Sequence, residues 1–140
     1  MSGAQEIVDE FLRRQRAMYA GGEVEPLVEL MAEDIVWHVP GTSPIAGDYR
    51  GRSAVVEYFA VRRALAGGSI SIVEHDEMHD DEVVVQLADG RARLGQTEAE
   101  WRTAGVYRVA GGKVAEAAVR YVCVDSRSGR PTALPAHIRA

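Results

Sequence analysis

The chain has almost no cysteine and no long apolar run, and each shortage excludes a class of protein. Cys123 is the single cysteine among 140 residues, which excludes an internal disulfide and an all-cysteine zinc site. No apolar stretch approaches the roughly 20 residues that a membrane-spanning helix needs. No basic segment followed by an apolar run opens the chain, as a secretory signal would. We therefore expect a cytoplasmic protein with no membrane partner.

Lysine is equally scarce, because Lys113 is the single lysine and the other basic residues are arginines. The sequence has 16 basic and 21 acidic residues, which gives a formal net charge of −5. An acidic chain with scattered arginines argues against nucleic acid as a partner. Hydrophobic residues make up 46% and charged residues 26% of the sequence, values typical of one globular domain of this length. We expect a single domain over residues 1–140, with 125–140 as a C-terminal tail.

Hydrophobic periodicity predicts helices first and strands afterwards. Gly21 and Gly22 end the first helix, and Gly111 with Gly112 predicts a hairpin between the last two strands. The stretch 47–51 has no clear period, and a turn is expected over 88–95. The helices are expected over 5–20, 24–32 and 53–66, and the strands over 35–39, 69–76, 82–88, 97–109 and 113–124. This order predicts an α+β fold with a mostly antiparallel sheet.

Alternation on the long strands separates an inner face from a charged outer face. The inner side chains are mostly aromatic, apolar or small, a combination suited to an apolar pocket. On the first helix, Phe11, Gln15 and Tyr19 are expected to face the same space. The inner residues of the last two strands are expected to be Thr97, Ala99, Trp101, Thr103, Gly105, Tyr107, Val109, Ala115, Ala117, Val119, Tyr121 and Cys123.

Six short stretches of the sequence carry a resemblance to known proteins. They are LMAEDIVWHVPG (30–41), PIAGDYRGR (44–52), EHD (74–76) with DDEVV (80–84), and YRV (107–109) with GKVAE (112–116). On these stretches the chain resembles, over residues 5–124, the nuclear transport factor 2-like (NTF2-like) proteins, and among them the SnoaL-like and ketosteroid-isomerase-like proteins. The resemblance implies a curved sheet wrapped around helices as a cone, with a pocket at its wide end, no cofactor, and homodimers formed through the outer face of the sheet.

The same resemblance also shows which catalytic groups are missing. A ketosteroid isomerase uses a carboxylate base together with a tyrosine and a protonated aspartic acid. In this chain those positions fall on Val39, Gln15 and Gly105. The scaffold is therefore retained without the usual proton-transfer groups, although Gln15 could still donate a hydrogen bond to a ligand carbonyl.

His38 is the catalytic candidate, because a near-neutral imidazole on the first strand suits general acid–base chemistry. Trp37 and His38 cannot both face inward on a regular strand, so a catalytic His38 requires a β-bulge before Pro40. If the strand is regular, His38 is structural. The expected ligand-binding residues are Gln15, Tyr19, Trp37, Val39, Tyr49, Trp101, Tyr107 and Tyr121.

Two functions remain open at this point. One is a cofactor-free isomerase, cyclase, dehydratase or hydrolase acting on a small hydrophobic molecule; the other is a non-catalytic binding or interaction domain on the same scaffold. An ionisable side chain pointing into the pocket would discriminate them. A minor alternative is a thioesterase, since 122–135 resembles the end of hotdog-fold thioesterases. The acidic stretch 75–82 is interpreted as a solvated turn, so no metal site is expected.

Overall fold

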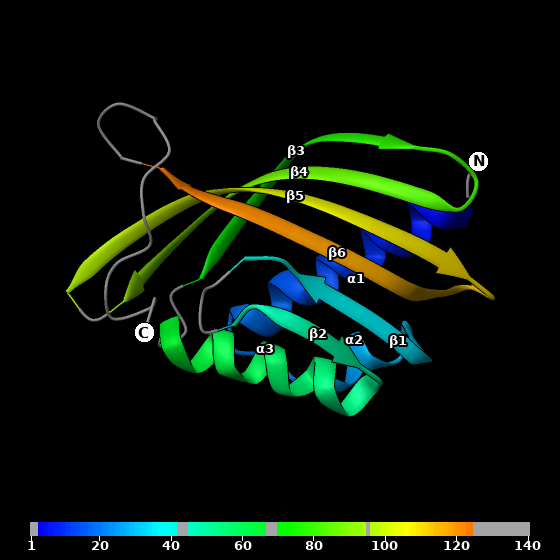
Figure 1. Cartoon of the computed structure of the whole chain (residues 1–140), viewed down its shortest axis with the longest axis horizontal. Helices are drawn as coiled ribbons and strands as arrows, with labels where there is room; N and C mark the ends of the chain where they lie inside the picture. The colour runs from blue at the N-terminus through cyan, green and yellow to red at the C-terminus, as the bar shows by residue number, and fades with distance from the viewer. Residues whose placement is uncertain (1–2, 42–44, 67–69, 95, 125–140) are drawn as a thin grey trace.

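The computed structural model describes residues 3–41, 45–66, 70–94 and 96–124. Helices precede most of the strands, as Figure 1 shows. None of the helices in these ranges is long and apolar enough to cross a membrane. The elements are α1 (Gly3–Tyr19), α2 (Glu25–Val28), β1 (Met31–Val39), β2 (Gly47–Arg50), α3 (Arg52–Ala66), β3 (Ser71–His79), β4 (Val83–Leu94), β5 (Thr97–Ala110) and β6 (Lys113–Val124).

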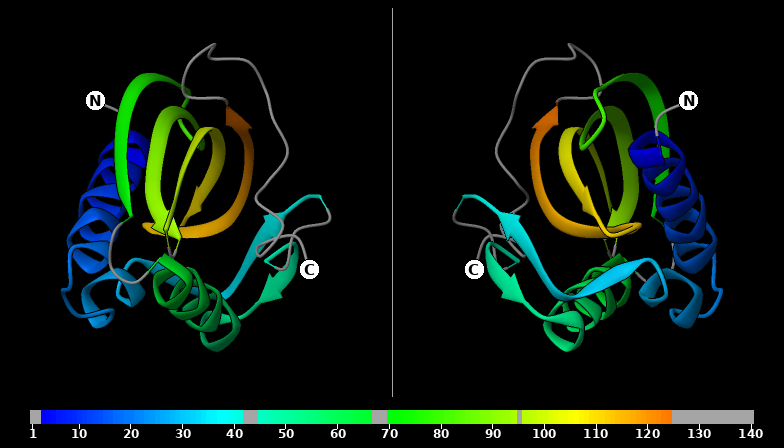
Figure 2. Two further views of the ribbon diagram at one scale, coloured as in Figure 1. Left: turned by 90° about the vertical axis from the view of Figure 1, so that its left-hand side faces the viewer. Right: turned by 90° about the vertical axis from the view of Figure 1, so that its right-hand side faces the viewer.

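The strands form one curved sheet in the order β2-β1-β6-β5-β4-β3. β1 runs parallel to β6, and every other neighbouring pair is antiparallel. Seen along the strands, the sheet curls so that α1 and α3 lie on its concave side (Figure 2). The structure confirms the α+β fold and the mostly antiparallel cone.

The core lies between the two long helices and the concave face of the sheet. Its centre is Trp37, whose side chain is only 1% exposed. The ring centroids of Phe11 on α1 and Phe59 on α3 lie 5.9 and 5.1 Å from that of Trp37, and the Tyr107 centroid lies at 6.0 Å. Aromatic pairs at these separations add to the stability that burial supplies. Helix, strand and helix are therefore joined through one indole.

The hairpin between β5 and β6 confirms the sequence prediction. Ala110 pairs with Lys113, and Gly111 and Gly112 both have positive φ, at 59° and 75°. Such a two-residue turn matches the twist of the flanking strands, and glycine adopts it without steric cost. The turn fixes the register that places alternate β5 and β6 residues on the concave face.

The predicted helix over 24–32 was too long. The helix covers Glu25–Val28, with Pro26 in its first turn, and β1 already begins at Met31. The backbone N–H of Val114 donates to the carbonyl of Leu30 at 2.7 Å, and Met31 pairs with Val114. Pairing with β6 therefore overrides the local helical preference of Leu30 and Met31.

Two extended segments were also misassigned. Residues 47–50, expected to be irregular, form β2, which pairs with β1 from Val36–Arg50 to Val39–Gly47. The turn expected over 88–95 was wrong over most of its length, because β4 continues to Leu94 and pairs there with Thr97. In both cases hydrogen bonds to the partner strand stabilise an extended conformation that the local sequence pattern does not predict.

Candidate functional site

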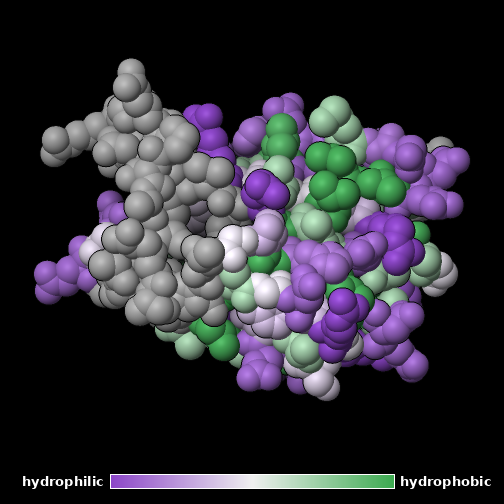
Figure 3. All heavy atoms as spheres, viewed as in Figure 1, coloured by the Kyte–Doolittle hydropathy of each residue, from purple (hydrophilic) through white to green (hydrophobic). Residues whose placement is uncertain are grey.

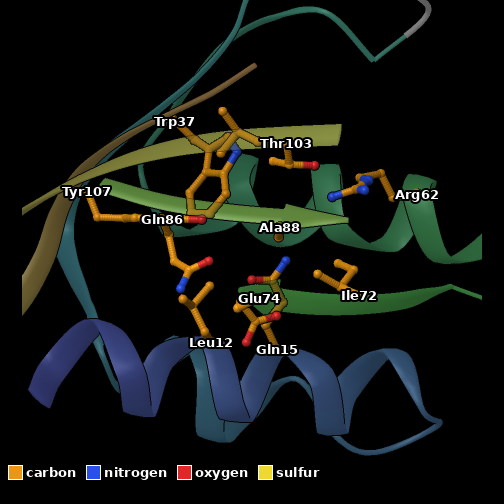
Figure 4. A pocket seen from close by; sticks show the side chains of 11 residues that line it. Leu12, Gln15, Trp37, Arg62, Ile72, Glu74, Gln86, Ala88, Thr103 and Tyr107 are labelled. Atoms are coloured by element: carbon orange, nitrogen blue, oxygen red, sulfur yellow. The ribbon is translucent and has the colours of Figure 1, made fainter. Parts of the chain in front are cut away.

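A cavity of about 30 Å³ lies inside the cone. α1 contributes Leu12 and Gln15, α3 contributes Arg62, and the concave face of the sheet supplies the remaining wall. The close-up in Figure 4 shows these side chains converging from opposite layers. The lining residues are Leu12, Gln15, Trp37, Arg62, Ile72, Glu74, Gln86, Ala88, Thr103, Tyr107 and Val119.

Three polar atoms in this lining are buried and have no hydrogen-bond partner among the described residues. They are the side-chain oxygens of Gln15 and Gln86 and the indole nitrogen of Trp37, and we call them the orphan atoms. Buried polar groups in native proteins are nearly always satisfied by protein, water or ligand. An empty cavity left by imperfect packing is lined by apolar groups. The three orphan atoms around this cavity therefore distinguish it from such a cavity.

Arg62 brings a cation into the aromatic interior, with its side chain 8% exposed. Its guanidinium carbon lies 5.4 Å from the ring centroid of Tyr19, 5.8 Å from that of Tyr58 and 5.9 Å from that of Trp101. Nη1 also donates a hydrogen bond to the Tyr58 hydroxyl at 3.4 Å. The aromatic faces attract the cation and hold it at the wall of the cavity.

Glu74 on β3 brings a carboxylate to the same cavity. Its side chain is 15% exposed and forms an ion pair with Arg16 on α1. Arg16 lines a second hollow of about 190 Å³, together with Tyr19, Ala20, Ile70, Ser71 and Ile72. Because Ile72 borders both spaces, the Arg16–Glu74 ion pair lies in the wall that separates the inner cavity from the outer hollow.

The buried phenols near the cavity remain protonated at neutral pH. Burial raises the pKa of Tyr107, and burial likewise raises the pKa of Tyr19. A phenol held in this form is a hydrogen-bond donor and does not serve as a base.

The structure places three of the predicted ligand-binding residues, Gln15, Trp37 and Tyr107, in the lining of the cavity. Tyr19 borders the outer hollow instead. Trp101 lies on the concave face beneath Arg62. The side chain of Tyr121 lies outside the described part of the structure, as does the tail 125–140.

Val39 and Tyr49 lie away from the cavity lining. Val39 is a buried core residue. The Tyr49 hydroxyl donates to the carbonyl of Ile45 at 2.6 Å, and its ring packs 4.9 Å from that of Tyr58. Tyr49 therefore reaches the wall only indirectly, through Tyr58 and its contact with Arg62, and Val39 belongs to the hydrophobic core.

His38 does not face the cavity, which corrects the geometry that its catalytic assignment required. The register between β1 and β2 is continuous from Val36 to Val39, so His38 lies on the opposite face from Trp37. There its Nδ1 lies 2.8 Å from Asp48 Oδ1, and its Nε2 lies 2.9 Å from Glu116 Oε2. The strand is regular at this point, and His38 joins β2, β1 and β6 on the outer face.

Two glycines shape the concave face by lacking a side chain. A Cβ at Gly105 would lie 2.7 Å from the Tyr107 hydroxyl, and a Cβ at Gly90 would lie 2.2 Å from the Trp101 indole nitrogen. Each aromatic ring folds over a glycine, Tyr107 over its own strand and Trp101 over β4. At Gly105, the position onto which the sequence resemblance places the aspartic acid of the ketosteroid isomerases, the phenol of Tyr107 occupies the space of a side chain.

Sequence reasoning missed Arg62, Glu74 and Gln86 as site residues. Arg62 falls at helical spacing with Val55 and Phe59, and this position on the apolar side of the third helix could have marked it as a buried cation. Glu74 and Gln86 each alternate with outward-facing neighbours on β3 and β4, a pattern that could have placed them inside. Thr103 and Val119 were expected on the inner face, and both line the cavity.

The fold and the cavity define an NTF2-like protein: a curved sheet closed by helices around an internal space. The SnoaL-like domain model matches residues 12–117, and the chain belongs to this family. The family and fold are those expected from the sequence, and not those of the hotdog thioesterases.

Known relatives and solved structures agree with this placement. Uncharacterized proteins of Mycobacterium bovis and Mycobacterium tuberculosis are 29% identical over 106 residues, covering 75% of this chain and 81% of each relative. Bal32a, from a soil-derived mobile gene cassette, superposes with a TM-score of 0.76 at 26% identity, covering 86% of this chain and 92% of that chain. An NTF2-like protein from Anabaena variabilis gives 0.78 at 16% identity, covering 91% and 93%.

Proposed function

We propose that the cavity binds a small, mostly apolar molecule that carries a few polar groups. The observation that supports this most directly is the set of orphan atoms on Gln15, Trp37 and Gln86, all of which border one space. Around them the wall is aliphatic or aromatic, with Leu12 and Val119 among its members. An apolar lining with a few convergent polar groups is the usual character of a small-molecule site.

Binding on this scale requires the wall to move. The inner cavity of about 30 Å³ accommodates roughly one or two water molecules, whereas a benzene-sized ligand needs about 150 Å³. The outer hollow of about 190 Å³ lies directly beyond the Arg16–Glu74 ion pair. Separation of that ion pair would join the two spaces into one that takes a single six-membered ring.

A set of single-ring aromatic and alicyclic compounds tests this proposal. Binding is followed through the indole N–H signals of the two tryptophans in ¹⁵N-labelled protein. We expect several compounds to shift the Trp37 signal. Ala88→Leu, which fills the cavity, should abolish those shifts, while the same change at the exposed Ala110 should preserve them. The proposal is wrong if no compound shifts either signal in the wild-type protein.

Catalysis by proton transfer is a second candidate function, and Glu74 is the observation that favours it. A carboxylate borders the cavity, while Arg62 and the Trp37 N–H could stabilise the oxygen of an enolate on the same ligand. In that reaction Glu74 takes a proton from the carbon next to a carbonyl, and the electron pair moves onto the carbonyl oxygen. The carboxyl group then returns a proton to carbon.

Deuterium exchange into cyclohexanone in D₂O measures this activity without knowledge of the natural substrate. We expect the protein to accelerate exchange at the carbons next to the carbonyl. Glu74→Gln should reduce the acceleration by about 10²–10⁴-fold while the ketone still shifts the Trp37 signal. If cyclohexanone binds but its exchange is not accelerated, the catalytic function is wrong and the non-catalytic binding function stands.

A further inference from the structure

The orphan atoms around the cavity are segregated, because the orphan donor of Trp37 lies on one side and the two orphan glutamine oxygens lie nearer α1 (Figure 4). Arg62, the indole N–H of Trp37 and the hydroxyl of Thr103 border the side nearest β5 (Figure 4). The guanidinium carries only donors, and the indole nitrogen, an orphan atom, is also only a donor. This side of the cavity therefore presents a fixed positive charge and an N–H with no acceptor among the described residues.

The opposite side presents a carboxylate and two amides, and each amide has an acceptor oxygen and a donor nitrogen. The amide of Gln15 points into the cavity from α1, and the amide of Gln86 points from β4 toward that helix (Figure 4). Their oxygens are the other two orphan atoms. The Glu74 carboxylate lies on this side as well, next to α1 and paired with Arg16. A ligand that satisfies both sides must offer acceptors at one end and a donor at the other.

We propose that the ligand is a small hydroxylated ring carboxylate. Its carboxylate lies against Arg62 and the Trp37 N–H, and its hydroxyl donates to Gln15 or Gln86. The proposal rests on the proposed binding function and specifies its chemistry. A guanidinium fork matches the two oxygens of a carboxylate in geometry and in charge. A ring between the two ends fits the aromatic and aliphatic walls formed by Trp37 and Tyr107.

The charges along the entry route agree with an anionic ligand. Arg16 borders the outer hollow and Arg62 borders the inner cavity, so a carboxylate meets a cation at both stages. The Glu74 carboxylate repels an anion that lies beside it, and this repulsion favours the orientation with the ligand carboxylate at the Arg62 side. Entry displaces Glu74 from Arg16, and the incoming carboxylate can replace it there transiently.

The test compares 4-hydroxybenzoate with two probes that each differ from it by one group: the neutral amide 4-hydroxybenzamide, and benzoate, which lacks the hydroxyl. Affinity is measured by calorimetry, and the site is identified by the Trp37 indole signal. We expect 4-hydroxybenzoate to bind at least about tenfold more tightly than the amide, since a charge-assisted hydrogen bond is lost in the amide. Benzoate should bind more weakly than 4-hydroxybenzoate because it leaves the glutamine oxygens without a donor.

Variants of Arg62 test whether this residue causes the preference for the carboxylate over the amide. Arg62→Gln should remove the tenfold preference for carboxylate over amide, whereas Arg63→Gln, on the neighbouring residue of α3, should retain it. Trp37→Phe keeps an aromatic ring, although a smaller one, removes the N–H and should weaken the binding of both 4-hydroxybenzoate and 4-hydroxybenzamide. If Arg62→Gln does not fold, Arg62→Lys keeps the charge and tests the fork alone, with a smaller expected loss of preference.

The outcomes separate this inference from the binding function. Equal affinities for the acid and the amide would overturn the carboxylate assignment and leave the binding function intact. A preference that persists in folded Arg62→Gln would overturn the role of Arg62. If none of the three probes shifts a tryptophan signal while neutral apolar rings do, the inference alone is wrong; if no compound shifts one, both proposals are wrong.

Discussion

His38 illustrates how one residue can carry catalytic chemistry in the sequence and a structural role in the fold. Its two ring nitrogens reach Asp48 on β2 and Glu116 on β6, and Arg108 shares Glu116 with it. Hydrogen bonds to Asp48 and then to Glu116 raise the pKa of His38 above its ordinary value of 6.5. The imidazolium therefore links three strands on the outer face.

His38→Gln should lower the melting temperature at about pH 6 and have little effect at about pH 8.5. The folded state binds the imidazolium proton more tightly than the unfolded chain. The stabilisation is thus fully present below about pH 6.5 and is lost as the pH rises through the raised folded pKa. Calorimetric unfolding at both pH values measures the difference. An equal loss at both would show that packing, and not charge, is what His38 contributes.

Gly105 is the second residue whose role follows from its neighbours in the fold. A side chain there would overlap the Tyr107 ring, whose hydroxyl oxygen and Cε2 both lie 2.7 Å from the Cβ position. The glycine therefore allows the phenol to fold over β5 toward the cavity.

Gly105→Ala should reduce the free energy of unfolding by about 1–3 kcal/mol, the usual cost of forcing atoms into a packed interior. It should also weaken ligand binding, because Tyr107 borders the cavity. Urea denaturation measures the stability. Gly3→Ala is the matched control: no described atom lies within 4 Å of its Cβ position, and alanine favours the helix. Unchanged stability in Gly105→Ala would contradict the packing described for Tyr107.

At the scale of elements, the contact between α1 and β3 contains a pair of carboxyl groups. Asp9 on α1 faces Glu77 on β3, which also accepts a hydrogen bond from Gln5 at 2.9 Å. Asp9 is exposed, yet desolvation where α1 meets β3, and then the hydrogen bond and charge of Glu77, raise its pKa to about 6, although His79 and Arg16 act in the opposite direction. The same two elements carry Gln15 and Glu74, so this contact supports the cavity.

Asp9→Asn should raise the melting temperature at about pH 7.5 and give no gain at about pH 4. With a folded pKa near 6, Asp9 favours folding below the unfolded pKa, and this stability is lost as the pH rises through the folded value. The amide keeps the hydrogen bond to Glu77 and removes the repulsion. Glu6→Gln, on the exposed side of the same helix, is the control. A gain that did not depend on pH would contradict this account.

At the scale of the whole molecule, the outer face of the sheet carries an apolar row between charged side chains. Met78, Val85, Val106 and Ala118 pair across β3, β4, β5 and β6 in succession, and Met78 and Val106 are 62% and 41% exposed. Figure 3 shows hydrophobic side chains gathered over this part of the sheet. Strand alternation predicted a charged outer face, and the centre of this face is less polar than predicted.

We propose that a second copy of the chain covers this row, forming the sheet-to-sheet homodimer that the family resemblance implies. Val106→Arg should therefore shift the sedimentation coefficient from dimer to monomer at micromolar concentration. Val61→Arg places the same charge at an exposed valine on α3 and should leave the dimer intact. A wild-type protein that sediments as a 15.2 kDa monomer would contradict the dimer, as would a dimer that both variants retain.

The sequence by itself determined the features that depend on neighbouring residues along the chain. The spacing of Phe11, Gln15 and Tyr19 defines one helix face, the two glycines at 111 and 112 define a hairpin, and alternation along 97–109 separates the two faces of β5. These are local signals, because helix and strand periods are set by backbone geometry within a few residues. They sufficed for the α+β order and for five residues of the cavity lining: Gln15, Trp37, Thr103, Tyr107 and Val119.

Only the tertiary structure decided which side chains meet. Arg62 and Glu74 come from α3 and β3 and reach one cavity because the sheet curls around both helices. His38 turned outward because pairing with β2 keeps β1 regular from Val36 to Val39. Long-range pairing sets strand register and curvature, and it depends on partners far along the chain. A local pattern therefore identifies the inner face, while the chemistry of the space inside it follows from how the layers close.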